Sequence, residues 1–339
     1  MELGIGMFGD LGFDQKTGKY KDAGLRIHEI LEQVKLMDEI GIDVFAMGEH
    51  HREDFAISSP EILLAAAASI TKNIKLASGV TVLSSSEPVK VYADFSTLDL
   101  ISDGRAEIMV GRGSFIESFP LFGYSLQDYE QLFDEKLDLL LKINSETNVS
   151  WSGELRPPMK NQTVYPRAKN GGKLPIWRAV GGTPQSVLNA AQLGMPLVVA
   201  IIGGMPVQFK NFIDFYKQEY LKAGHPEEEM QLAIHSHTFV SEDESVIEDY
   251  FNNYKAQMDR IGKSRGWAPY TKAQYDAGRS KDGALFMGNP DEVADKINRM
   301  KELFGITRFI GHMDVGDPNH DLMMKSIQLF GEKVAPQVK

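Results

Sequence analysis

The chain of 339 residues contains no cysteine, which excludes disulfide bonds, thiolate zinc sites and a cysteine nucleophile. It has no block of lysine or arginine, and its formal net charge is −11. This argues against nucleic acid as a partner, because phosphate contacts need clustered positive charge. No apolar segment is long enough to span a bilayer, and the N-terminus lacks the basic start and apolar run of a signal peptide. These absences predict a cytoplasmic protein without a membrane partner.

What the chain does have is a regular alternation of short apolar runs with amphipathic helices. Eight strand–helix units fit a closed α/β fold, the (β/α)8 TIM barrel, better than an open sheet. We expect one domain over residues 1–339, with insertions at the C-terminal mouth of the barrel and a mobile, polar excursion at about 263–287. The expected strands are 3–8, 44–47, 74–83, 106–110, 176–180, 197–202, 231–240 and 307–311.

An arginine between two glycines follows the fourth expected strand, in the sequence GRGS at 111–114. Glycines let a phosphate approach the backbone, and the guanidinium of Arg112 supplies a fixed charge with paired donors. In TIM barrels the chemistry lies at the C-terminal ends of the strands, where this segment falls. The segment therefore predicts an anion site.

A second glycine-rich segment, GGTPQS at 181–186, follows the fifth expected strand. Thr183 is a natural helix N-cap, with Pro184 in the first turn. Backbone donors at the positive end of a helix suit a phosphate, although an ordinary capped helix explains this segment equally well. Together with Arg112, the segment favours a phosphate site.

Two adjacent histidines, His50 and His51, follow Glu49 at the end of the second expected strand. They could act in proton transfer, form part of a metal site, or belong to a polar loop. Histidine titrates near neutrality, so it can serve as acid or base without a large pKa shift. A single histidine is more often structural, but two at the end of a barrel strand favour a function.

His235 and His237 lie two residues apart on the seventh expected strand and therefore face the same side. Such a pair can bind a metal, with Asp314 as a possible further ligand. Hydrogen-bonded or outward-facing histidines are the favoured alternative, so we expect no metal. The sequence GIGMFG at 4–9 matches a dinucleotide-binding pattern, but it begins inside a strand and no helix follows, so we reject that reading.

Several segments in order resemble the bacterial luciferase-like family of flavin-dependent monooxygenases, and the resemblance covers nearly the whole chain. It implies the (β/α)8 barrel predicted above, with reduced FMN, or in one branch a reduced deazaflavin, bound at the C-terminal mouth. The segments are GEHHREDF at 48–55, residues 75–113, LFDEKLDLL at 132–140, VSWSGE at 149–154, residues 164–197 and GNPDEVADKI at 288–297.

The resemblance also assigns roles to residues of this chain. Arg112 would hold the flavin phosphate, with the backbone around Gly181, Gly182, Thr183 and Ser186 completing the cradle. A non-proline cis peptide would fall at Gly79-Val80, behind the flavin ring, with Thr81 near it. His50 would lie by the reacting flavin, supported by Glu49 and His51. The excursion at 263–287 matches a mobile, lid-like loop.

The implied activity is a monooxygenase reaction. Reduced FMN would react with dioxygen to give a flavin peroxide, which oxidises a small organic substrate, and His50 would manage a proton. A separate reductase would supply the reduced flavin, or bound FMN would be reduced in place, and relatives often form homodimers. Gly111 stands where light-emitting members carry a cysteine, so we do not expect light emission.

Three alternatives remain open at this stage. The first is a deazaflavin-dependent enzyme that transfers hydride, and the second is a non-catalytic flavin-binding protein. The third is a metal-dependent hydrolase built on His50, His235 and His237.

Overall fold

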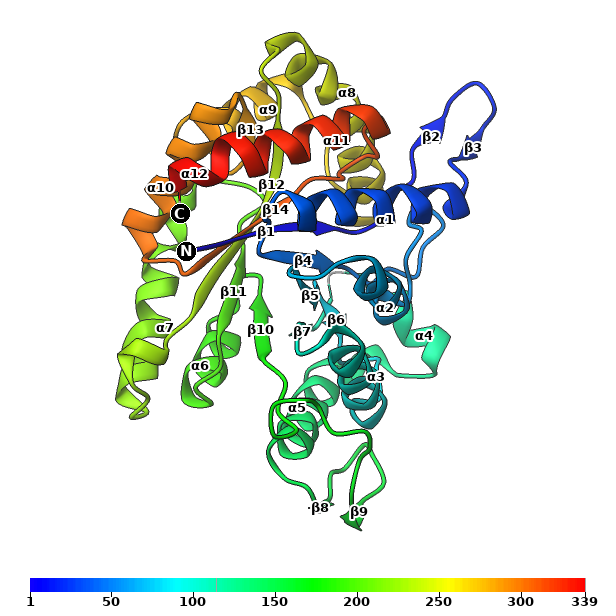
Figure 1. Ribbon diagram of the computed structural model, residues 1–339, viewed down its shortest axis with the longest axis vertical. Coiled ribbons are helices and arrows are strands. Elements are labelled where there is room, and N and C mark those ends of the chain that lie inside the picture. Colours follow the sequence, from blue (N-terminus) through cyan, green and yellow to red (C-terminus); the bar gives the residue numbers. More distant parts are fainter. Residues whose placement is uncertain (114, 339) are drawn as a thin grey trace.

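Eight parallel strands close into a barrel whose outside is covered by helices (Figure 1). The computed structural model describes residues 1–113 and 115–338, so Ser114 of the predicted anion motif lies outside the described residues. Pairing of Ile108 with Ile176 closes the ring, and the predicted (β/α)8 barrel is confirmed. In order around the ring the strands are β1 (Glu2–Met7), β4 (Val44–Met47), β5 (Lys75–Ser78), β7 (Ala106–Gly111), β10 (Ile176–Val180), β11 (Leu197–Ala200), β12 (Leu232–Val240) and β14 (Arg308–His312).

The helices begin and end where local sequence signals place them. At the start of α10, the Asn289 side chain accepts from the Glu292 amide at 3.0 Å, and the Glu292 carboxylate accepts from the Asn289 amide at 3.0 Å, which is a capping box. Gly305 ends the same helix with a φ of 65°. The main helices are α1 (Ala23–Glu39), α2 (Pro60–Ile70), α3 (Pro88–Ser102), α5 (Tyr129–Ser145), α6 (Pro184–Gln192), α7 (Lys210–Lys222), α8 (Glu244–Arg265), α10 (Pro290–Phe304) and α11 (His320–Leu329).

The third expected strand is divided in two. β5 is followed by β6 (Thr81–Val82), and between them the Gly79-Val80 peptide bond is cis, as the family resemblance implies. Both pieces pair with β7, because Leu76 lies beside Ala106 and Thr81 beside Val110.

Two hairpins project from the barrel (Figure 1). The first, β2 (Phe13–Asp14) with β3 (Lys19–Tyr20), follows β1 and so lies at the C-terminal mouth. The second, β8 (Val149–Trp151) with β9 (Met159–Gln162), lies in the connection from α5 to β10. The segment between these two strands contacts the starts of α5 and α3, where Glu154 accepts from Gln131 at 2.6 Å and Arg156 pairs with Glu87 at 2.9 Å.

The expected excursion at 263–287 contains more regular structure than its composition suggested. It includes the end of α8, then α9 (Lys272–Arg279), and reaches β13 (Phe286–Gly288), which pairs with β12. Tyr275 is buried, and its hydroxyl donates to the Ile247 carbonyl at 2.9 Å. The buried ammonium of Lys296 donates to carbonyls of this segment, among them those of Ser280 at 2.9 Å and Leu285 at 2.5 Å. The mobility of the segment 263–287 stays a prediction.

The N-terminal end of the barrel is filled, which leaves the C-terminal end for a site. Trp177 is buried inside, and the Arg308 guanidinium lies 4.2 Å from the centre of its ring. Arg308 also pairs with Glu107 at 2.6 Å and with Glu2 at 2.6 Å, so this buried charge is compensated. No helix within the described residues is long and apolar enough to cross a membrane.

Candidate active site at the C-terminal mouth

A cavity of about 430 Å³ opens at the C-terminal ends of the strands, within the size range of small-molecule sites. Thr81 and Gly182 are absent from its lining. Thr81 is buried, and its hydroxyl has no hydrogen-bond partner among the described residues. The cavity brings together the other residues that the family resemblance assigns to the flavin site, namely Glu49, His50, His51, Gly79, Val80, Arg112, Gly181, Thr183 and Ser186.

One end of the cavity is formed by Arg112 and the start of α6. Arg112 donates from Nη2 to the Thr183 hydroxyl at 3.0 Å and from Nη1 to Glu130 at 3.0 Å. Thr183 occupies the N-cap position, as predicted, but its side chain makes no capping hydrogen bond. The hydroxyl is turned toward Arg112 instead, so no side chain at that position caps the first-turn amides of α6.

The glycines keep the backbone of this end accessible. A Cβ added at Gly181 would meet no atom within 4 Å, and Gly182 has a φ of +130°, which favours glycine. A Cβ at Gly111 would lie 2.9 Å from the Val80 side chain. The strand end before Arg112 therefore packs directly against the residue that follows the cis bond.

Arg178 is a residue of this site that the sequence analysis missed. It lies on β10, lines the cavity, is 3% exposed and stacks over the Phe133 ring at 4.3 Å. Its Nε and Nη1 atoms are buried without a hydrogen-bond partner among the described residues. Burial lowers the pKa of Arg178 to about 10. A buried guanidinium without hydrogen-bond partners costs free energy, so an anionic ligand would stabilise it. The available signal was an arginine within the apolar strand IWRAV.

His50 lines the cavity from the end of β4, inside an aromatic box. Its ring centroid lies 4.5 Å from that of Phe8, 4.3 Å from Phe55 and 5.0 Å from Phe115. Its Nε2 is buried and has no partner among the described residues. Burial, with smaller contributions from Arg52 and His51, lowers the pKa of His50 to about 3. Burial thus moves the pKa of His50 below the range of a free histidine and keeps its imidazole neutral at pH 7.

Glu49 and His51 form a pair of their own. Glu49 accepts a hydrogen bond from His51 Nε2 at 2.9 Å and another from the Val82 amide at 2.9 Å. No hydrogen bond within the described residues joins either side chain to the His50 ring. Instead of supporting that ring directly, as expected, the pair fixes the loop after β4 against the strand after the cis bond.

The His-x-His pair on β12 does not converge on one point. His235 lines the cavity and contacts His312, with 3.3 Å between His235 Nε2 and His312 Nδ1. His237 Nδ1 instead contacts the Tyr254 hydroxyl at 2.8 Å. His312 was not noticed in the sequence, although it ends the eighth strand. The geometry therefore does not favour a hydrolase metal site built on His50, His235 and His237.

One grouping among the described residues is compact enough to hold an ion. Ligand atoms of Asp10, His312 and Asp314 lie within 4.8 Å of one another. However, Asp314 already accepts from the Phe8 and Gly9 amides and from Arg26 at 2.9 Å. A guanidinium against the same carboxylate opposes a second cation.

The comparison with known families decides the affiliation of this barrel. The model of the luciferase-like monooxygenases matches residues 1–308. The chain belongs to this family. Among curated relatives of this luciferase-like protein, N-acetyl-S-alkylcysteine monooxygenase of Bacillus subtilis is 25% identical over 310 residues, which is 86% of this chain and 88% of the relative.

Solved structures agree with the barrel described here. Monooxygenase RslO1 from Streptomyces bottropensis superposes with a TM-score of 0.85 at 22% identity, covering 100% of both chains. The oxygenating constituent of 3,6-diketocamphane monooxygenase of Pseudomonas putida, in complex with FMN, gives 0.77 at 20% identity, covering 100% of this chain and 99% of that one. The F420-dependent tetrahydromethanopterin reductase of Methanopyrus kandleri gives 0.74 at 19% identity, covering 100% and 99%. The same fold thus occurs in a protein that binds FMN and in an enzyme that depends on the deazaflavin F420.

Proposed function

We propose that this protein is a flavin-dependent monooxygenase that uses reduced FMN and dioxygen to oxidise a small organic substrate. The observation that carries the proposal is that one cavity is lined by two arginines, Arg112 and Arg178, and by a neutral histidine, His50, whose Nε2 has no partner among the described residues. We call the part of the cavity that holds the two arginines and the start of α6 the anion-binding end. The residues present fit FMN, because the phosphate needs fixed cations and free amides while the ring needs an apolar slot.

The anion-binding end would hold the phosphate. Arg112 would donate to the phosphate oxygens in place of Glu130, which is 78% exposed and can move into solvent. The amides at the start of α6 would add donors at the positive end of the helix dipole, beside the open backbone of Gly181 and Gly182. Arg178 would supply a second cation, and the phosphate would compensate its buried charge.

When bound, reduced FMN supplies the electrons that activate dioxygen. The residues of this chain would orient the ring and exclude water. Gly79, Val80 and Thr81 would lie on one side of it, and Phe8, Phe55 and Phe115 surround His50 with apolar surface. Because the His50 imidazole is neutral, it can accept or donate one hydrogen bond at Nε2 as the reaction moves a proton. Glu49 and His51 would hold the loop that carries it.

Three further parts of the proposal concern the setting of the reaction. A separate reductase would deliver the reduced flavin, unless bound FMN is reduced in place. The segment 263–287 would close over the occupied mouth. A homodimer and a cytoplasmic location remain predictions of the sequence.

Anaerobic titration with reduced FMN, and in parallel with a reduced deazaflavin coenzyme, tests the proposal. Reduced FMN should bind, and rapid mixing with oxygenated buffer should give a transient absorbance band distinct from that of oxidised flavin. Binding of the deazaflavin without FMN binding would instead support hydride transfer. FMN binding with no transient would indicate a flavin carrier, and neither outcome is compatible with the proposed monooxygenase.

A further inference from the structure

A line of three polar side chains runs from the cavity into the wall of the barrel. His235 lines the cavity and is partly exposed there, whereas His312 is 2% exposed and Asp314 is 0% exposed. His235 Nε2 lies 3.3 Å from His312 Nδ1, and His312 Nε2 lies 3.3 Å from Asp314 Oδ1. Each ring nitrogen in this line except His235 Nδ1 thus faces another member of it.

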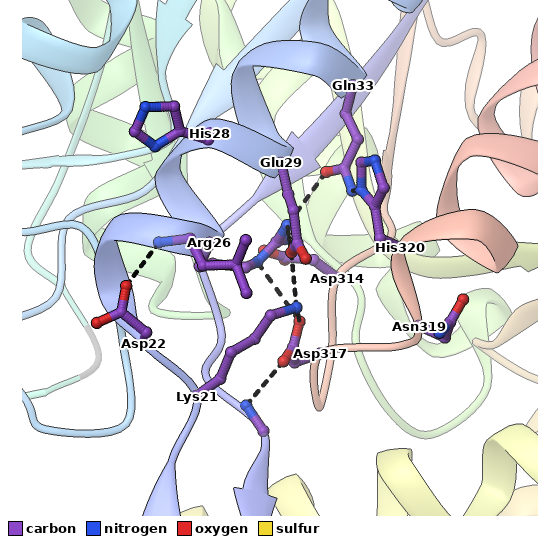
Figure 2. Close-up of polar contacts among 12 residues, drawn as sticks. Lys21, Asp22, Arg26, His28, Glu29, Gln33, Asp314, Asp317, Asn319 and His320 are labelled. Atoms are coloured by element: carbon purple, nitrogen blue, oxygen red, sulfur yellow. Dashed lines mark hydrogen bonds and ion pairs between the residues drawn. The ribbon is translucent and has the colours of Figure 1, made fainter.

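The inner end of the line is a carboxylate that only accepts hydrogen bonds. Asp314 Oδ1 accepts from the Phe8 amide at 3.0 Å, and Oδ2 accepts from the Gly9 amide at 2.8 Å and from Arg26 Nη2 at 2.9 Å. Figure 2 shows Arg26 reaching Asp314 from α1, with Gln33 and Asp317 contacting other parts of the same guanidinium. Since the donors around Asp314 are N–H groups, its oxygens are held as acceptors.

This acceptor fixes the proton positions on both rings. Burial lowers the pKa of His312 well below its usual value and that of His235 to about 4, so each ring is neutral at pH 7 and carries one N–H. Asp314 Oδ1 can only accept, so the nitrogen that faces it, His312 Nε2, carries the proton and His312 Nδ1 is left as an acceptor. His312 Nδ1 then needs a donor, which places the His235 proton on Nε2. The lone pair of His235 is left on Nδ1.

We infer that His235 is a hydrogen-bond acceptor of the cavity, held in this role by His312 and Asp314, and that its Nδ1 binds an O–H or N–H donor of the bound molecule. His312 and Asp314 are positioning residues that act through His235. Only the identity of the donor, reduced FMN or a substrate hydroxyl, rests on the proposed function. The role is separate from that of His50, because no hydrogen bond within the described residues joins the two rings; each packs edge-on against Phe8, with ring centroids 4.5 Å and 6.2 Å away.

The backbone of β1 provides the space that this arrangement needs. A Cβ added at Gly6 would lie 2.7 Å from His235 Nε2 and 3.2 Å from its Cε1, well inside van der Waals contact. A glycine at this position lets the ring approach the strand closely while Nε2 lies 3.3 Å from His312 Nδ1. Gly6, which belongs to the rejected dinucleotide pattern, is thus explained by its close contact with the His235 ring.

Nitrogen NMR of the flavin-free protein, with histidine labelled by ¹⁵N, reads out the tautomer directly, and the His235→Asn variant assigns the signal. His235 should be neutral with its proton on Nε2. A proton on Nδ1, or an imidazolium, at pH 7 in the wild-type protein would overturn the inference without any variant. Because this measurement needs no flavin, its outcome is independent of the proposed function, which fails if reduced FMN does not bind.

The Asp314→Asn variant tests the positioning role. An amide can turn its NH2 group toward His312 Nε2, which would move the His312 proton to Nδ1 and the His235 proton to Nδ1 in turn. The matched control is Asp317→Asn, since Asp317 also contacts Arg26, at 3.6 Å, but makes no contact with His312. The His235 tautomer should invert in the first variant only. An unchanged tautomer in folded Asp314→Asn, or the same change in both variants, would contradict the positioning role.

The donor is identified by adding ligands to the labelled protein. If reduced FMN alone shifts the Nδ1 resonance of His235, the donor belongs to the flavin. If the resonance moves only when phenol, a small O–H donor with an apolar body, is added to the FMN-loaded protein, the donor belongs to the substrate. A resonance that moves with neither probe would overturn the binding role.

Discussion

The guanidinium of Arg112 donates a hydrogen bond to the hydroxyl of Thr183 across 3.0 Å, although the two residues are 71 positions apart in the chain. β7 and β10 are neighbours where the barrel closes, so the residues after them meet. The contact costs α6 its side-chain cap, which typically contributes about 1 kcal/mol. Two glycine-rich segments that lie far apart in the chain therefore meet at one end of the cavity.

Replacing Arg112 with alanine should weaken the binding of reduced FMN by about 1.5–3 kcal/mol, the range for a charged hydrogen bond, or roughly 10- to 150-fold in dissociation constant. Arg156→Ala is the matched control, because its side chain is 21% exposed against 25% for Arg112 and pairs with Glu87 outside the cavity lining. A flavin titration measures both. Equal losses in the two variants would refute a specific phosphate contact.

Arg178→Met should weaken FMN binding while leaving the melting temperature of the flavin-free protein unchanged or higher, since it removes a buried charge without a hydrogen-bonded partner. Arg26→Met is the contrasting variant. Arg26 is 1% exposed but pairs with Asp314 at 2.9 Å, so its loss should cost about 3–5 kcal/mol of unfolding free energy. Calorimetry with and without FMN measures both. A strongly destabilised Arg178→Met would show that Arg178 is structural.

His50→Ala should keep FMN affinity near that of the wild type, because His50 lies outside the anion-binding end. It should shorten the lifetime of the oxygen-derived absorbance transient and raise the yield of hydrogen peroxide, since both the unpartnered Nε2 and part of the apolar box are lost. His28→Ala, at an exposed position on α1, should change neither quantity. A His50→Ala protein with a normal transient would remove His50 from the mechanism.

Acid should destabilise the fold steeply below pH 6.5. Burial lowers the pKa of four histidines, to about 3 for His50 and His237 and to about 4 for His235, so the unfolded chain binds protons at a pH where the native protein does not. Their contribution is complete above pH 6.5 and is lost as the pH falls toward 4, by up to ~1.4 kcal/mol per pH unit for each histidine. The four are His50, His235, His237 and His312.

Asp10 acts in the opposite direction, because burial and Asp314 raise its pKa. As the pH falls, the folded protein takes up one proton at Asp10 before the unfolded chain does, which stabilises the fold. Urea unfolding between pH 7 and 5 measures the net slope. His237→Asn should lower the slope by about one histidine's contribution, whereas His28→Asn, at an exposed position, should leave it unchanged. A slope that is unchanged in His237→Asn would show that the pKa of His237 is not lowered in the folded protein.

Gly6→Ala should destabilise the protein by about 1–3 kcal/mol, the usual cost of overpacking, because the new methyl group would lie 2.7 Å from His235 Nε2. The cost should largely disappear in a His235→Ala background, so a double-mutant cycle should show strong coupling. Gly181→Ala, where a Cβ meets nothing within 4 Å, is the control for the glycine-to-alanine change itself. Additive effects would mean that Gly6 is needed for another reason.

The sequence by itself determined the barrel and several of the residues that line the cavity. Eight apolar runs separated by amphipathic helices leave few alternatives to a closed parallel sheet, and polar residues just after those strands must gather at one mouth. The sequence alone therefore predicts that Arg112, Thr183 and His50 lie in one cavity, as they do. It also indicated that no dinucleotide fold surrounds the glycines of β1.

Only the tertiary structure decided which side chains pair and which do not. Pattern rules report the face of a strand, whereas a hydrogen bond depends on atoms brought together from distant segments. Glu49 therefore pairs with His51, Arg178 is buried without a partner, and His312 links His235 to Asp314. The pKa of His50 follows from burial by three aromatic rings that lie on separate segments of the chain, and burial of this kind exists only once the barrel has closed.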